Sequence, residues 1–113
     1  MKYAPQQFVR RSIVFAAVIP VGPSAEEHAR LIDLLDSLSS FEPLVSRVFI
    51  VVDAEPGSIG SITERTRLAI EQIPNPRNGH GAPLGGGLCA GILAGLRRCA
   101  EVLPQADFVV KLD

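Results

Sequence analysis

The chain has 113 residues, of which 47% are hydrophobic and 20% charged, and its formal net charge is −1. This is the size of one domain, with enough apolar residues to bury a core without disulfides or a structural metal. The balanced charge excludes the basic surface that is typical of nucleic-acid binding, so we expect no nucleic-acid partner. No run approaches the ~20 apolar residues of a membrane span.

The two cysteines, Cys89 and Cys99, fall in a segment with helical spacing. Ten residues of helix would separate their Cα atoms by about 15 Å, far beyond the roughly 4.4–6.8 Å that a disulfide requires. Both are expected to be free thiols, which suits a reducing compartment and predicts a cytoplasmic location.

Residues 1–12 are expected to form a polar lead-in, and residues 13–113 a single domain. The domain opens with an apolar run over residues 13–19. Two arginines before this run give it the outline of a signal peptide, but the run is short and no small-residue cleavage site follows. Its continuous hydrophobicity favours a strand buried on both faces, as in a parallel sheet, and Pro20 is expected to end it.

Ser24 and Glu27 have the spacing of a capping box, which predicts the start of a helix. Its apolar stripe consists of His28, Leu31, Leu35 and Leu38. The elements expected next are a strand over 48–52 ending at Asp53, a short helix over 62–67, and a third strand over 68–73 ended by Pro74.

Residues 88–103 return to helical period, with a predicted core-facing stripe of Leu88, Ile92, Leu96, Ala100 and Leu103. Gly91 and Gly95 weaken this helix but would allow close packing against a sheet. A fourth strand over 108–112 ends at Asp113. The exposed sheet edge after this strand favours self-association into a homo-oligomer.

Strands alternating with helices predict an α/β fold, a Rossmann-like three-layer sandwich around a mainly parallel sheet of about four strands. Ligands of such sheets bind beyond the carboxyl ends of the strands. Pro20, Asp53 and Asp113 each follow a predicted strand, so we expect them at one edge, around one crevice. A carboxylate there can accept from a ribose or a base, or coordinate Mg²⁺ or Mn²⁺.

A glycine-rich loop over residues 75–87 precedes the third helix. Its backbone N–H groups, including those around Asn78 and Gly79, could contact a diphosphate, or its glycines could serve only a flexible loop with positive φ angles. His80, between two glycines, could contact a phosphate or be exposed to solvent, and exposure is the more common outcome for such a histidine. The loop lacks the Walker lysine and the G-x-G-x-x-G spacing, which disfavours a P-loop or a dinucleotide site.

Four segments of the sequence resemble motifs of GT-A glycosyltransferases, especially the inverting family 2. These are Val18-Ile19-Pro20-Val21 at the first strand, Leu35-Asp36-Ser37-Leu38 on the first helix, Val51-Val52-Asp53 at the second strand, and Val109-Val110-Lys111-Leu112-Asp113 leading into a D-x-D metal motif. The resemblance covers residues 13–113 and implies the nucleotide-sugar-binding half of such an enzyme.

The resemblance also implies roles for individual residues. The backbone at Pro20 and Val21 would pass beside the base, and Asp53 would accept from the base or ribose. Arg77 and Asn78, which lie earlier in the sequence, would substitute for the family's A-R-N segment. Asp113 would be the first acid of the metal motif and bind Mn²⁺ or Mg²⁺, which neutralises the departing diphosphate while an acceptor hydroxyl attacks the anomeric carbon.

The sequence departs from the family pattern at several points. The usual D-G-S continuation after Asp53 is replaced by residues 54–58, and residues 83–87 hold no A-R-N segment. The sequence stops at Asp113, so the second acid of the metal motif and the acceptor half with its catalytic base are absent. We therefore expect a chain truncated at the metal motif that does not catalyse transfer by itself, and no catalytic residue is assigned.

Two other functions remain open from the sequence. A sugar-phosphate nucleotidyltransferase has a related sheet, but its basic, glycine-rich segment after the first strand has no counterpart in residues 20–24. A non-catalytic α/β module that binds a nucleotide or a partner chain is the other alternative.

Overall fold

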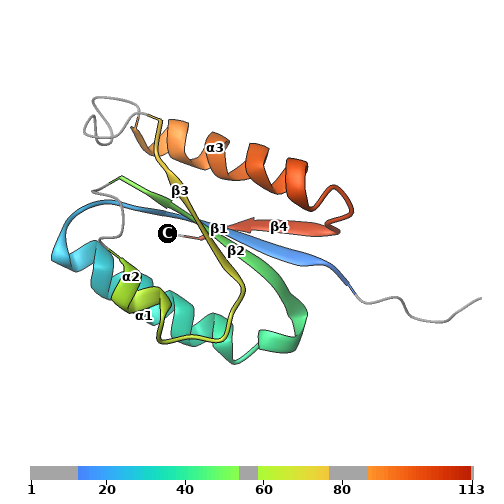
Figure 1. Cartoon of the computed structure of the whole chain (residues 1–113), viewed down its shortest axis with the longest axis horizontal. Helices are drawn as coiled ribbons and strands as arrows, with labels where there is room; N and C mark the ends of the chain where they lie inside the picture. The colour runs from blue at the N-terminus through green and yellow to red at the C-terminus, as the bar shows by residue number, and fades with distance from the viewer. Residues whose placement is uncertain (1–12, 54–58, 77–86, 113) are drawn as a thin grey trace, which may run out of the picture.

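The computed structural model describes residues 13–53, 59–76 and 87–112, and these form an α/β fold (Figure 1). In chain order the elements are β1 (Phe15–Val21), α1 (Ala25–Ser39), the 3₁₀ helix η2 (Glu42–Leu44), β2 (Val45–Val52), α2 (Gly60–Thr63), β3 (Ile70–Pro74), α3 (Gly87–Val102) and β4 (Phe108–Lys111). The predicted alternation of strands and helices is confirmed.

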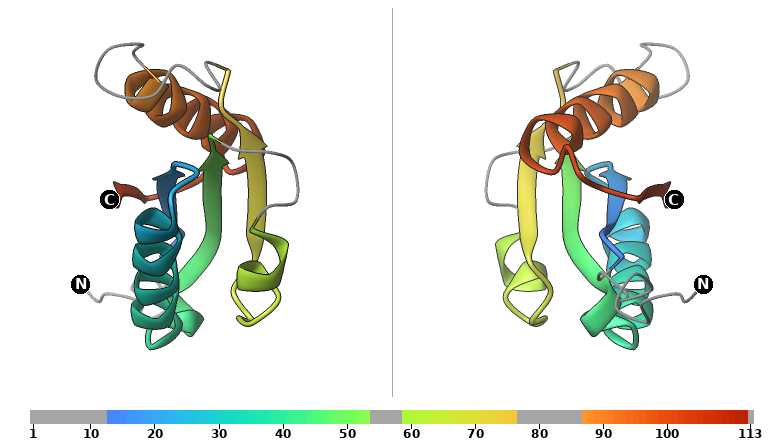
Figure 2. Two further views of the ribbon diagram at one scale, coloured as in Figure 1. Left: turned by 90° about the vertical axis from the view of Figure 1, so that its left-hand side faces the viewer. Right: turned by 90° about the vertical axis from the view of Figure 1, so that its right-hand side faces the viewer.

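The described strands form one parallel sheet in the order β3-β2-β1-β4. Helices α1 and α2 cover one face, and α3 covers the other, which completes the predicted three-layer sandwich (Figure 2). Because neighbouring residues of a strand point to opposite faces, β1 and β2 contribute to both cores. Ile19 and Ile50 pack beneath α1, whereas Val18 and Phe49 pack beneath α3.

Helix α1 begins as predicted, with Ser24 as its N-cap. The Ser24 hydroxyl accepts from the Glu27 N–H at 3.2 Å, which satisfies one of the helix's free amide groups. Leu31, Leu35 and Leu38 are the buried residues of the helix and face the sheet, also as predicted. Helix α2 is shorter than expected, and its end is followed by a turn in which the Leu68 N–H donates to the Thr66 hydroxyl.

Pro20 lies inside β1 and is buried, so the prediction that it ends the strand is wrong. Successive strand residues direct their backbone groups to opposite neighbours. The Val21 carbonyl accepts a hydrogen bond from the Asp53 N–H at 2.8 Å and therefore faces β2. The Val18 carbonyl accepts from the Leu112 N–H at 2.9 Å and therefore faces β4. Residue 20 therefore faces β4, and its missing N–H leaves the pairing of β1 with β2 intact.

Pro74 also lies within a strand, β3, where the sequence placed it as a terminator. The next residue, Asn75, donates its N–H to the Val52 carbonyl at 3.0 Å, so odd-numbered residues of β3 face β2. Pro74 faces outward from this edge strand, where no ladder hydrogen bond is lost.

Helix α3 turns a different face to the sheet from the one predicted. Gly91 and Gly95 are buried, whereas Leu88 and Leu96 are 44% and 39% exposed. A Cβ atom at Gly95 would lie 2.4 Å from Cγ1 of Val18 on β1, so the helix backbone rests directly on the sheet. Of the predicted stripe, Leu88, Leu96 and Ala100 are exposed, and Ile92 and Leu103 are half-buried. The predicted close packing through glycine is confirmed, and the predicted stripe is wrong.

A charge network also ties α3 to the sheet. Glu71 on β3 pairs with Arg98 of α3 and, at 3.5 Å, with Arg47 of β2. The hydrogen bond that the Arg98 guanidinium donates to the Glu71 carboxylate raises the pKa of Arg98. Within the part of the chain that the structure describes, no helix has the length and hydrophobicity needed to cross a membrane.

Candidate functional site

The candidate site is the carboxyl edge of the sheet, where β1, β2 and β3 end level with one another. In the sheet register Val21 pairs with Val52, and Val52 pairs with Pro74. The residues that follow these strands, Gly22, Asp53 and Asn75, therefore lie side by side along this edge. In parallel sheets the ligand-binding crevice opens at this edge, where neighbouring strands connect to opposite sides of the sheet. Here that switch point lies between β1 and β4.

Asp53 is placed where the sequence predicted it, directly after β2 at the carboxyl edge. Its N–H donates to the Val21 carbonyl at 2.8 Å, which fixes the residue next to the end of β1. Its side chain is partly exposed. A carboxylate held at this position is a hydrogen-bond acceptor for a ribose hydroxyl or a base N–H.

Asn75 is a member of this edge that sequence reasoning missed. It is 6% exposed and is the buried polar residue of the described chain. Its amide Nδ2 lies close to α3, since a Cβ at Gly91 would be 3.0 Å from it. The Asn75 side chain therefore lies between the end of β3 and the first turns of α3. Its position directly after a strand, like that of Asp53, was the available signal.

The start of α1 is acidic and does not offer a phosphate site. Glu26 and Glu27 lie in its first turn, and Glu27 forms an ion pair with Arg30 at 3.0 Å. The Glu27 carboxylate also covers Gly22, where a Cβ atom would lie 1.9 Å from Oε2. Negative charge over this helix terminus opposes the binding of a phosphate there. A dinucleotide-type site, with its pyrophosphate on the helix after the first strand, is therefore disfavoured.

The predicted site residues on β1 contribute backbone rather than side chains. Pro20 is buried in the strand, and Val21 is buried beneath α1. The other predicted site residues, Asn78, Gly79 and Asp113, lie outside the described residues, as do Arg77 and His80. In ranges 13–53, 59–76 and 87–112, no three His, Cys, Asp or Glu residues are grouped as a metal site would require.

His28 lies on α1, and its Nε2 atom is buried without a hydrogen-bond partner among the described residues. Such an unsatisfied polar atom costs about 1–3 kcal/mol. We expect His28→Leu to raise the free energy of unfolding by about 1 kcal/mol in urea denaturation followed by circular dichroism. The exposed neighbour Ala29 supplies the control, because Ala29→Leu should give no such gain. A loss of stability in His28→Leu would show that the imidazole makes a stabilising contact.

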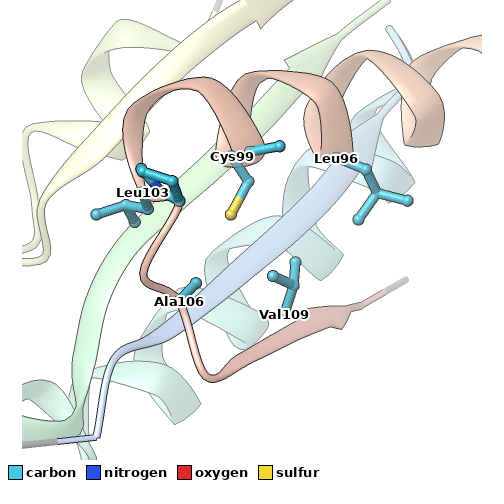
Figure 3. A pocket seen from close by; sticks show the side chains of 7 residues that line it. Leu96, Cys99, Leu103, Ala106 and Val109 are labelled. Atoms are coloured by element: carbon cyan, nitrogen blue, oxygen red, sulfur yellow. The ribbon is translucent and has the colours of Figure 1, made fainter.

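An apolar hollow of about 370 Å³ lies between α3 and β4 (Figure 3). Its lining consists of Leu96, Cys99, Ala100, Leu103, Pro104, Ala106 and Val109. Cys99 is buried and, like exposed Cys89, is a free thiol as predicted. Burial raises the pKa of the Cys99 thiol. Apart from the Cys99 thiol the lining side chains are all apolar, so they hold few groups that could orient a nucleotide, and the carboxyl edge remains the candidate site.

Comparisons with protein-family models, with curated proteins and with solved structures find no match to this chain.

Proposed function

We propose that the chain binds a nucleoside-diphosphate sugar at the carboxyl edge, as the donor-binding part of a GT-A-type glycosyltransferase. The observation that carries this proposal is the hydrogen bond between the Asp53 N–H and the Val21 carbonyl. It holds an acidic residue beside the end of β1, next to the switch point of a parallel sheet. An acid at the end of the second strand is the group that contacts the ribose in related nucleotide-binding sheets.

The charges near the start of α1 argue against a phosphate site there. Glu26 and Glu27 at the start of α1 oppose a triphosphate or pyrophosphate on that helix. Residues 20–24 hold no basic group that could grip a triphosphate after β1, which disfavours a nucleotidyltransferase. The phosphates would instead lie toward the start of α3, near Asn78 and Gly79 of the glycine-rich sequence that precedes it.

A divalent ion, Mn²⁺ or Mg²⁺, would be held by Asp113 together with diphosphate oxygens. The Leu112 N–H donates to the Val18 carbonyl, so Leu112, the residue before Asp113 in the sequence, lies beside β1. One or two carboxylates plus substrate phosphates are the usual ligands of Mg²⁺ in proteins. When bound, the ion would offset the charge of the leaving diphosphate. The free thiols at Cys89 and Cys99 support a reducing location such as the cytoplasm.

Titration calorimetry of the 113-residue chain tests this function. We expect UDP or GDP, and the matching nucleotide sugars, to bind weakly, with little dependence on Mn²⁺ because only one acid of the metal motif is present in this sequence. Tighter binding of UTP or GTP would favour the nucleotidyltransferase. Heat signals absent for every nucleotide would favour a module that binds a partner chain.

A further inference from the structure

The junction between β1 and β4 contains a break in hydrogen bonding that the sequence builds in with Pro20. The two strands pair in parallel register up to Val18 and Lys111. The Leu112 N–H then donates to the Val18 carbonyl at 2.9 Å. In a regular parallel ladder the next hydrogen bond would run from the N–H of residue 20 to the Leu112 carbonyl. Residue 20 is proline and has no N–H to donate.

The break lies at the switch point, where the crevice of a parallel sheet opens. On the other side of β1 the pairing with β2 continues three residues further, to Val21, whose carbonyl accepts from the Asp53 N–H. Pro20 therefore ends pairing on the β4 side alone. The Leu112 carbonyl therefore accepts no ladder hydrogen bond from β1, at the position where the crevice begins.

We propose that the Leu112 carbonyl is a recognition group of the site, accepting a hydrogen bond from a hydroxyl or N–H group of the bound nucleoside. This inference rests on the proposed function and adds a second acceptor beside Asp53. Pro20 is the positioning residue, because it withholds the backbone donor that would occupy this carbonyl. A ribose hydroxyl and a base N–H have the donor chemistry that the carbonyl requires.

Substitutions of Pro20 that restore the N–H test the proposal. Pro20→Val adds side-chain volume at this buried position and Pro20→Ala removes it, but both supply the same backbone donor. We expect the new residue-20 amide to be protected in hydrogen exchange by NMR, like its neighbours in β1. We also expect both variants to bind UDP or GDP about fivefold more weakly than the unmodified chain, the loss of one hydrogen bond. Pro43→Ala, in η2, controls for the general loss of a proline and should change neither property.

Analogues identify the donor group on the ligand. If the donor is a ribose hydroxyl, the 2′-deoxy or 3′-deoxy nucleotide should bind the unmodified chain and the Pro20 variants equally. If it is a base N–H, the difference between the proteins should persist with both analogues.

The results separate this inference from the proposed function. A residue-20 amide that exchanges as fast as an unstructured one would overturn the inference, because the Leu112 carbonyl would not face it. A protected amide with unchanged UDP and GDP affinity would also overturn it, while leaving the Asp53 site intact. If the unmodified chain binds no nucleotide, the proposed function and the recognition role of the Leu112 carbonyl both fail. A protected residue-20 amide in the variants would still show that Pro20 interrupts the hydrogen bonding between β1 and β4.

Discussion

Replacing Gly95 with alanine is expected to lower the free energy of unfolding by about 2 kcal/mol, although alanine is the better helix former. The added Cβ would lie 2.4 Å from Cγ1 of Val18 and 3.2 Å from Cγ2 of Val51, both fully buried in the sheet. Overpacking against two buried side chains at these distances is expected to cost about 3 kcal/mol, the upper part of the usual range, and the helix-propensity gain offsets about 1 kcal/mol of it. A net loss of this size is a substantial part of a small domain's stability.

Two other glycines provide matched controls for the same substitution. Gly60 is the first residue of α2, and an alanine methyl group there would meet no atom within 4 Å beyond its chain neighbours and the backbone of its own helix. Gly60→Ala should therefore be neutral or stabilising. Gly91→Ala should fall between the two, because its Cβ would lie 3.0 Å from Nδ2 of Asn75. Urea denaturation followed by circular dichroism ranks the three variants. Equal stability of Gly95→Ala and Gly60→Ala would show that α3 does not rest on β1 as described.

Replacing Asp53 with asparagine is expected to weaken UDP or GDP binding about tenfold. Hydrogen bonds to a charged group contribute about 1.5–3 kcal/mol and neutral ones about 0.5–1.5 kcal/mol, and asparagine keeps only a neutral acceptor. Each 1.4 kcal/mol is a factor of ten in affinity. The backbone hydrogen bond from residue 53 to Val21 is kept in the variant, so the local geometry should persist. Titration calorimetry measures the change, after thermal unfolding has shown that the variant is folded.

Asp33, an exposed acid on α1, provides the control for charge alone. Asp33→Asn makes the same change of net charge away from the carboxyl edge and should leave nucleotide affinity unaltered. Unchanged affinity in a folded Asp53→Asn variant would remove Asp53 from the site and, with it, the main support for nucleotide binding.

The sequence predicted the order and type of the elements because each one carries its own local signal. The capping box at Ser24 and Glu27 marked the start of α1, and continuous apolar runs marked the buried strands. The errors arise where the outcome depends on neighbours in the sheet. Pro74 is tolerated because it faces outward from an edge strand, and Pro20 because it faces β4 beyond the last β1–β4 pair, Val18 with Lys111. Only the strand order and register reveal this.

The inward face of α3 was mispredicted for a related reason. Periodicity alone places leucines such as Leu96 toward the core, but the sheet approaches so closely that only glycine fits at position 95. At the site, Asp53 was predicted because it directly follows an unambiguous apolar run. Asn75 was missed because Pro74 was taken as the end of its strand, which left Asn75 in the loop.

The strand order has a consequence for how the crevice assembles during folding. Strands β1, β2 and β3 are neighbours in both sequence and sheet, whereas β4 returns to β1 across most of the described chain. The Asp107 carboxylate at its start accepts from the Val14 N–H, 93 residues away, at 2.8 Å. Closing such a long loop carries a larger entropic cost and delays folding, so the β1–β4 border should be the last part of the sheet to form and the first to open. A ligand that bridges this border would bind the closed form selectively and protect the sheet against local opening.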